Sequence, residues 1–141
     1  MNFKILKQSA SSKARATSFQ TRHGLIETPV FMPVGTRATI RAQTPDSVAR
    51  LNAQIILSNT YHLMLSPGIE VFKKFQGIHQ FMNWNKPVLT DSGGFQIFSL
   101  ENNRKIDDSG AEFIDTRNGN RIILTPEKSI EMQMAINSDI A

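Results

Sequence analysis

The sequence predicts a mixed α/β fold built on a mostly parallel β-sheet. Short apolar segments that are typical of buried strands alternate with helix-start signals, and polar residues follow the strands. With 141 residues, the chain is long enough for one domain with a core of its own. A (β/α)₈ TIM barrel needs about 250 residues, so the three to four strand–helix units predicted here would be the N-terminal portion of such a barrel. They are equally compatible with a small open doubly wound sheet, and periodicity alone favours neither arrangement.

Residues 29–34 form the first predicted strand, a short apolar segment that ends at Gly35. Its two prolines argue against a central position, because proline cannot donate a hydrogen bond to a neighbouring strand. Thr44-Pro45-Asp46 then predicts the start of a helix that runs to about Asn52. A hydroxyl side chain caps the helix, proline occupies its first turn, and an acid faces the positive end of its dipole.

Residues 54–58 and 87–90 form the next two predicted strands, and Asp91 follows the later one. Between them, Ser66-Pro67 predicts another helix start. The apolar side chains that share one face of this helix are Ile69, Phe72 and Phe75.

The alternation is interrupted near residue 111. Residues 111–115 and 121–124 flank Asn118-Gly119, a strong signal for a β-hairpin, so residues 111–124 are predicted to be an inserted hairpin. Thr125-Pro126-Glu127 starts one more helix, whose methionines are expected to fill the core. Its apolar pairs at i, i+4 spacing are Ile130/Met134 and Met132/Ile136.

The domain organisation predicted from these elements is a single incomplete domain over residues 1–141. Residues 1–28, approximately, form an N-terminal extension, of which residues 9–21 are polar and basic and are expected to be partly mobile. Residues 139–141 resemble the opening of a fourth strand. Because such an open sheet edge leaves strand and apolar surface uncovered, the chain alone is expected to aggregate or fold poorly.

Composition narrows the possible functions. The absence of cysteine excludes disulfides, cysteine-ligated zinc and thiol catalysis within the chain. No segment is apolar for long enough to be a signal peptide core or a membrane span, so a cytoplasmic protein with no membrane partner is expected. Residues 1–50 contain eight Lys and Arg against two acids. This excess fits a polyanionic partner such as nucleic acid, or simple solubility.

The candidate site lies where the strands end, because chemistry in parallel α/β folds sits at the carboxyl ends of strands. This rule places three segments on one rim, namely Gly35-Thr36, Asn59-Thr60-Tyr61-His62 and Asp91-Ser92-Gly93-Gly94. Asp91 is a carboxylate beside two glycines that let a ligand approach the backbone. Phe95 offers a face for stacking a planar base, and Gln96 adds an amide. These groups suit a heteroaromatic ring, but an ordinary turn with Phe95 in the core explains the pattern about as well.

Other polar residues are assigned to structure or solvent. A lone His62 is most often a hydrogen-bonded structural residue. His23 and His79 show no ligand spacing, so the sequence predicts no metal site. Arg37 and Arg41 can reach a phosphate or simply face solvent.

Three blocks of the sequence resemble the tRNA-guanine transglycosylases, in that family's order. They are Phe31-Met32-Pro33-Val34-Gly35-Thr36, Asn59-Thr60-Tyr61-His62-Leu63-Met64-Leu65-Ser66-Pro67-Gly68 and Leu89-Thr90-Asp91-Ser92-Gly93-Gly94-Phe95-Gln96. The resemblance runs from about residue 20 to the end of the chain, and the Met64-Leu65 form is similar to the bacterial queuosine branch.

The resemblance implies a (β/α)₈ TIM barrel that exchanges the anticodon wobble guanine of certain tRNAs for 7-aminomethyl-7-deazaguanine. One aspartate attacks the ribose to give a covalent enzyme–tRNA intermediate, and the incoming base displaces it. Asp91 matches the acid/base aspartate of the family. Ser92, Gly93, Gly94 and Phe95 match its base-binding loop, with Phe95 stacking on the purine. Asn59, Thr60 and Gln96 join the predicted substrate-binding set.

The resemblance also places much of the family's machinery outside this sequence. The nucleophilic aspartate, the main tRNA-binding surface and a zinc site of three cysteines and a histidine match positions beyond Ala141. A homodimer is expected for the full-length protein. The chain alone is therefore expected to be inactive, as a fragment of a longer enzyme. The alternative is a non-catalytic truncated paralogue that binds a base, tRNA or a full-length partner subunit.

Overall fold

The computed structural model describes residues 2–100 and 104–141 of the chain. Its helices and strands, in chain order, are β1 (Asn2–Gln8), β2 (Arg15–Thr21), β3 (Gly24–Thr28), α1 (Pro45–Arg50), β4 (Ile56–Ser58), α2 (Thr60–Leu65), α3 (Ile69–Lys74), α4 (Ile78–Met82), β5 (Val88–Thr90), α5 (Gly94–Leu100), β6 (Arg104–Asp107), β7 (Gly110–Ile114), β8 (Arg121–Leu124) and α6 (Pro126–Ile136).

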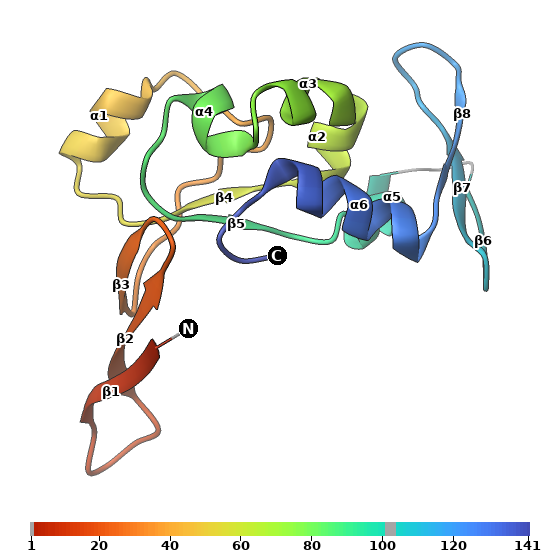
Figure 1. Ribbon diagram of the computed structural model, residues 1–141. Coiled ribbons are helices and arrows are strands. Elements are labelled where there is room, and N and C mark those ends of the chain that lie inside the picture. The colour runs from red at the N-terminus through yellow and green to blue at the C-terminus, as the bar shows by residue number, and fades with distance from the viewer. Residues whose placement is uncertain (1, 101–103) are drawn as a thin grey trace.

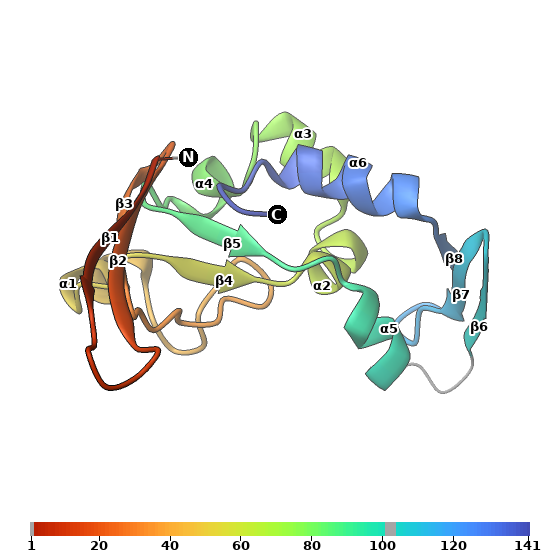
Figure 2. The same ribbon diagram turned by 90° about the horizontal axis from the view of Figure 1, so that it is seen from below.

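The strands form three separate sheets. β1, β2 and β3 form an antiparallel sheet, β4 and β5 a parallel pair, and β6, β7 and β8 a second antiparallel sheet. The parallel pair lies in the middle of the molecule, with one antiparallel sheet at each end (Figure 1). Seen from below, α3, α4 and α6 lie on the same side of this pair (Figure 2).

The central pair is extended by one bridge on each side. β4 and β5 are in register from Ile56 opposite Val88 to Ser58 opposite Thr90. Val34 bridges Leu57 on one edge and Ile140 bridges Leu89 on the other, both in parallel. Four successive segments therefore run side by side in the same direction, which confirms the predicted mixed α/β fold. That this arrangement closes into a (β/α)₈ barrel stays a prediction.

The prediction of a buried strand at residues 29–34 is wrong. This segment makes a single bridge, and Phe31 and Val34 are 80% and 54% exposed. The two prolines explain the difference, since Pro29 and Pro33 have no N–H to donate. A proline carbonyl can still accept a hydrogen bond, and that of Pro33 accepts from the Leu57 amide at 3.0 Å.

The two helices predicted from a Thr-Pro start are confirmed. Thr44 caps α1 in a reciprocal capping box with Ser47, and Thr125 caps α6 by accepting from the Lys128 amide at 3.2 Å. Asn137, in the left-handed conformation, ends α6.

The helix predicted to start at Ser66-Pro67 begins later, at Ile69, and is preceded by a helix that the sequence analysis missed. Asn59 caps α2, and Ser66 follows its last turn. The sequence analysis placed residues 59–62 at the end of a strand and predicted no helix there, although Asn is among the best N-cap residues. The short helix α4 was also missed.

The N-terminal segment is more ordered than predicted. Residues 15–21, which were expected to belong to a mobile stretch, form the middle strand of a sheet, and Thr17, Ser18 and Thr21 are buried there. The predicted hairpin is confirmed as β7 and β8, with Gly119 in the turn at a φ of +75°, and its being an insertion in a barrel stays a prediction. A third strand, β6, joins it.

The main core lies between the parallel pair and its helices. Its buried members are Ala38, Val48, Ile56, Leu63, Phe72, Ile78, Met82, Trp84, Val88, Met132 and Ile136. A second cluster of Tyr61, Ile97, Phe113 and Leu124 packs the β6–β8 sheet against α2 and α5. Only one predicted pair of α6 is in the core, because Ile130 and Met134 are 57% and 75% exposed.

None of the helices in the described ranges is long and apolar enough to cross a membrane.

Phe72 and Phe75 offer a matched test of this core. Phe72 is fully buried, whereas Phe75, next to the same helix, is 41% exposed. We expect Phe72→Ala to lower the free energy of unfolding by about 3–5 kcal/mol, because it leaves a cavity in the core. Phe75→Ala is expected to cost less than half as much, since its site is already open to water. Urea unfolding followed by circular dichroism measures both, and equal losses would contradict this placement of the core.

Candidate functional site

The candidate site lies where β4 and β5 end side by side. Ser58 and Thr90 are partners in the parallel register, so the residues that follow them, Asn59 and Asp91, emerge at the same edge. Asn59 and Thr60 are almost completely buried. The structure thus brings together two of the three segments that the sequence placed on one rim. The third, Gly35-Thr36, adjoins β4 at the same edge, because Val34 bridges Leu57 in parallel.

Asp91 is the centre of a dense set of hydrogen bonds. Its Oδ1 accepts from the backbone amides of Thr60 (3.0 Å) and Gly93 (3.1 Å). Its Oδ2 accepts from the side-chain amides of Asn59 and, at 3.3 Å, Gln96. Two of these N–H donors follow β4 and two follow β5, and together the four fix the carboxylate in one orientation.

The residues that hold Asp91 are themselves held by α2. Asn59 caps this helix through its Oδ1, which accepts from the His62 amide at 3.1 Å, while its Nδ2 reaches Asp91. The Thr60 hydroxyl donates to the Asp91 carbonyl. One turn of helix thus positions both the backbone and the side chain of the candidate acid.

Gly93 is required by a close approach to α2. It has a φ of +78°, and a Cβ at this position would lie 2.8 Å from the Tyr61 backbone nitrogen. Gly94 has neither constraint, because the nearest atom to its Cβ would be the Ser92 Oγ at 3.6 Å. The two neighbouring glycines therefore have different roles.

Beyond Gly93 the loop faces outward. Phe95 is 71% exposed, so the alternative in which Phe95 belongs to the core is wrong. Ser92 is also exposed, and its carbonyl accepts from the Ser129 hydroxyl of α6 at 3.1 Å. Gln96 points its Nε2 at Asp91, but its Oε1 is buried and has no hydrogen-bond partner among the described residues. A buried acceptor without a donor is unfavourable unless a ligand supplies one.

His62 lies next to this site in a polar environment. Burial lowers the pKa of His62, and the positive charge of Arg37 lowers it further, while the Asp91 carboxylate acts in the opposite direction. The imidazole is therefore neutral near pH 7. Gly35, on the third predicted segment, lies beside β4 and donates to the Leu57 carbonyl at 2.7 Å.

The arrangement suits the binding of a planar, polar ring. A fixed carboxylate, an exposed aromatic face and an unpaired amide oxygen lie within six residues of the chain. A carboxylate in this position can exchange a proton with a bound base. The chain has no cysteine, so it does not fit the three-cysteine zinc site that the resemblance implies, and zinc enters no step that we assign to these residues.

The sequence analysis missed one further cluster of candidate residues. His23, His79 and Asp139 come from distant parts of the chain, yet their side-chain nitrogens and oxygens all lie within 4.8 Å of one another. No spacing rule finds such a set, because the three residues are separated by more than fifty positions and only the fold unites them.

Gly93 provides a test of the site geometry. We expect Gly93→Ala to lower the free energy of unfolding by about 1–3 kcal/mol, because alanine is strained at positive φ and its methyl group meets the α2 backbone. Gly94→Ala is the matched control and should change it by less than about 0.5 kcal/mol. Thermal unfolding of the two variants compares them directly, and equal midpoints would show that the loop does not approach α2 as described.

The sequence was compared with protein families and with curated proteins. A model of the family described as queuine tRNA-ribosyltransferase matches residues 9–141. Relatives with that name include those of Desulforudis audaxviator, 54% identical over 139 residues, of Caldanaerobacter subterraneus subsp. tengcongensis, 51% identical over 140, and of Shouchella clausii, 50% identical over 140. These alignments cover 99% of this chain but 37% of each relative, so the chain spans little more than a third of their length. The chain belongs to the queuine tRNA-ribosyltransferase family.

Proposed function

We propose that this chain supplies the acid/base aspartate and the base-binding loop of a tRNA-guanine transglycosylase. The single observation that supports this role best is the geometry of Asp91. Its carboxylate is fixed by four N–H donors at the end of β5 and stands four residues from an exposed phenylalanine.

In the proposed reaction a nucleophilic aspartate, expected beyond Ala141, attacks the ribose anomeric carbon and the bond to guanine breaks. The leaving base takes up a proton, and the incoming 7-aminomethyl-7-deazaguanine gives one up when it attacks in turn. Asp91 carries this proton in both directions, so that no net acid or base is consumed.

The loop after Asp91 is proposed to hold the base. Phe95 stacks on the purine, and the buried Gln96 Oε1, which has no partner in the part of the chain that the structure describes, accepts from one of its N–H groups. Asn59 and Thr60 hold the Asp91 carboxylate in position, and the small residues Ser92, Gly93 and Gly94 leave room for the ring to approach. Each of these residues contacts Asp91, the base or the loop backbone.

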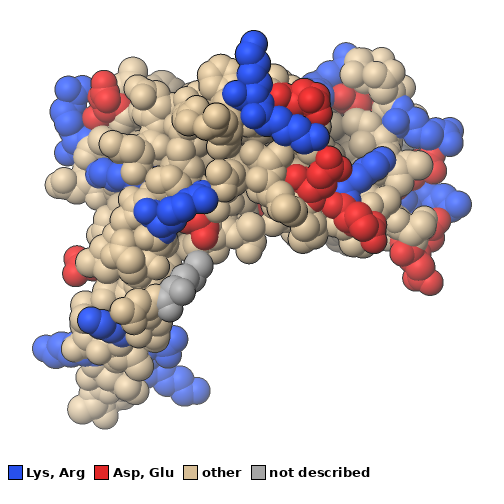
Figure 3. All heavy atoms as spheres, in the orientation of Figure 1, with Lys and Arg blue, Asp and Glu red and all other residues tan. Residues whose placement is uncertain are grey.

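The proposed macromolecular substrate is tRNA, which the names of the relatives mention. Basic side chains are prominent at the far end of the N-terminal sheet, where acidic ones are scarce (Figure 3). Lys4, Lys7, Lys13 and Arg15 belong to or adjoin β1 and β2. Such a cluster suits contact with a phosphate backbone. The dimer, the cysteine-ligated zinc and the cytoplasmic location implied by the resemblance belong to the same proposal for the full-length protein.

Asp91 is tested most sharply in a chimera. Residues of this chain replace the 139 matching residues of the Desulforudis audaxviator relative, and incorporation of labelled guanine into tRNA is measured. We expect Asp91→Asn to reduce the exchange rate by about 10²–10⁴-fold, because the amide cannot carry a proton. Asp108→Asn makes the same chemical change in an exposed turn and should leave the rate unchanged. An unimpaired Asp91→Asn chimera would refute the acid/base role.

Phe95 is tested by base binding. We expect Phe95→Ala to weaken binding of guanine to the 141-residue chain by about tenfold, since stacking contributes about 1–3 kcal/mol per base. Phe98→Ala is the matched control, because Phe98 is also exposed at 62% but faces the Arg104 guanidinium at 4.8 Å. Calorimetric titration measures both. Base binding without exchange by the chimera would favour the alternative of a non-catalytic binding protein.

A further inference from the structure

Three titratable residues meet at the amino end of β5, away from the candidate acid. His23 lies in the turn between β2 and β3, His79 in α4, and Asp139 in the segment after α6. Asp139 Oδ2 accepts from the Val88 amide, at the first residue of β5, at 3.1 Å. Asp91 follows the other end of the strand, about 10 Å away for three residues of extended chain. The cluster is therefore separate from the site described above.

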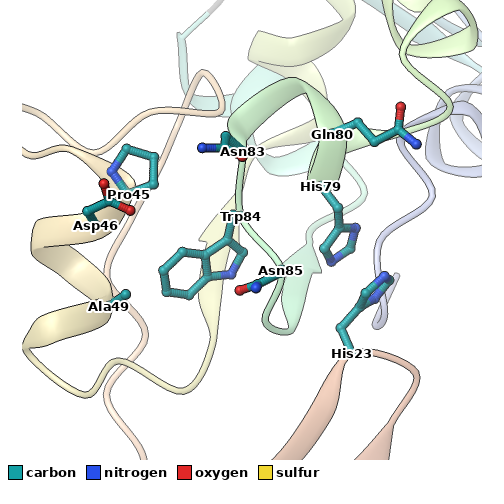
Figure 4. Close-up of a pocket in the computed structure, with 9 residues that line it drawn as sticks. All are labelled: His23, Pro45, Asp46, Ala49, His79, Gln80, Asn83, Trp84 and Asn85. Carbon is teal, nitrogen blue, oxygen red and sulfur yellow. The ribbon is translucent and has the colours of Figure 1, made fainter.

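The donor atoms of the cluster converge. The Asp139 side chain is fully buried, and its two oxygens face different histidines. His23 Nδ1 lies 2.9 Å from Oδ1, and His79 Nε2 lies 3.1 Å from Oδ2. The two imidazole rings are stacked, with centroids 3.6 Å apart and planes 19° from parallel. Figure 4 shows the rings of His23 and His79 side by side. Stacked rings direct their nitrogens toward the same carboxylate.

We propose that His23, His79 and Asp139 form a binding site for a divalent first-row metal ion of the zinc class. Two imidazole nitrogens and one carboxylate are a common protein ligand set for such ions. In a tetrahedral zinc site the ligand atoms lie about 3.3 Å apart, given bonds of about 2.0 Å. The nitrogen–oxygen separations of 2.9 and 3.1 Å, each to a different oxygen of Asp139, are close to this spacing. One atom from each of the three residues lies within 4.8 Å of the other two, so the side chains must shift to bring all three onto one ion.

The donor types of the cluster suit a cation. Asp139 offers a carboxylate oxygen, and each histidine offers the ring nitrogen that now faces Asp139, once the proton on that nitrogen is released or moves to the other ring nitrogen.

The surroundings supply the outer contacts that metal ligands need. The backbone amides of His23 and Val88 both donate to the Asp139 carboxylate, at 3.1 Å each, and would keep it oriented with the ion in place. Arg22 opposes a cation, but its guanidinium is bound by the carbonyl and side-chain oxygens of Asn137. We therefore expect moderate rather than very tight affinity.

A pocket of about 430 Å³ opens beside the two histidines. Asp46 lies on the opposite side of this pocket, and Asn83 and Asn85 line it as well, so polar side chains that can hold water surround it (Figure 4). Water from this pocket can complete the coordination of an ion held by three protein ligands. The proposed site differs from the cysteine-ligated zinc site of the resemblance, because it uses no cysteine and lies within these 141 residues.

The proposal is tested with Co²⁺ and Zn²⁺ added to the metal-free 141-residue chain near neutral pH. We expect one equivalent of Co²⁺ to give a visible absorption spectrum, with a Kd below about 100 µM. His23→Gln and His79→Gln should each weaken binding by at least about tenfold, because each removes a ligand. His62→Gln is the matched control, since it removes the third histidine of the chain from outside the cluster and should bind the ion normally. Circular dichroism establishes that each variant is folded.

A measurement on the unmutated chain makes the test independent of variant stability. Zn²⁺ should shift the ¹⁵N resonances of His23 Nδ1 and His79 Nε2, and leave those of the His62 ring unchanged. Absence of binding by both ions at millimolar concentration would overturn the proposal and leave the cluster as a hydrogen-bonded structural unit. Binding that persists in both cluster variants, or that shifts His62 instead, would equally overturn it.

Discussion

The parallel pairing of β4 with β5 is the constraint on which the candidate site depends. It sets Ser58 beside Thr90, so the chain continues from both strands at the same edge. From there a single helical turn, beginning at Asn59, folds over Asp91 and supplies three of its bonds, two to the carboxylate and one to the carbonyl. A shift of one residue in this register would turn Asn59 and Asp91 to opposite faces of the sheet.

The site combines a rigid part with an exposed part. Asp91 is fixed by donors from Asn59, Thr60, Gly93 and Gln96, whereas Phe95, close by in the chain, lies mostly in solvent. A group that must exchange protons benefits from a fixed position, because acid/base catalysis depends on alignment. A surface that stacks on a base must remain accessible until the base arrives. The close packing of Gly93 against Tyr61 marks the boundary between the two parts.

Local signals in the sequence predicted the fold where a few neighbouring residues determine the conformation. Thr44 and Thr125 before proline, and Asn118 before Gly119, fix a cap or a turn without help from distant residues. Residues 29–34 failed because a strand exists only with a partner, and the two prolines leave that segment a single bridge to Leu57. The N-terminal sheet was missed for a related reason, since β1 is exposed along its whole length and its alternation of polar and apolar residues covers only Asn2 to Ile5.

The same distinction applies to the candidate site. Asp91, the glycines and Phe95 were found because they are contiguous, but the four donors to Asp91 and the burial of the Gln96 Oε1 are visible only in three dimensions. The sequence analysis placed Asn59 and Thr60 correctly at the end of a strand. It missed the helix α2, which positions their N–H groups to donate to Asp91. His23, His79 and Asp139 had no local signal at all, because each is ordinary among its own neighbours.

The two ends of β5 are linked through the segment after α6. Asp139 receives hydrogen bonds from His23, His79 and Val88, and the next residue, Ile140, pairs with Val88 and Thr90. The Ser138 hydroxyl bonds that of Thr90 at 2.7 Å, one residue before Asp91. The buried carboxylate of Asp139 therefore holds in place the same short strand that presents Asp91. Because β5 has only three residues, its amino end cannot move independently of its carboxyl end. The histidine cluster and the candidate acid thus belong to one hydrogen-bonded framework, which runs through the backbone of β5.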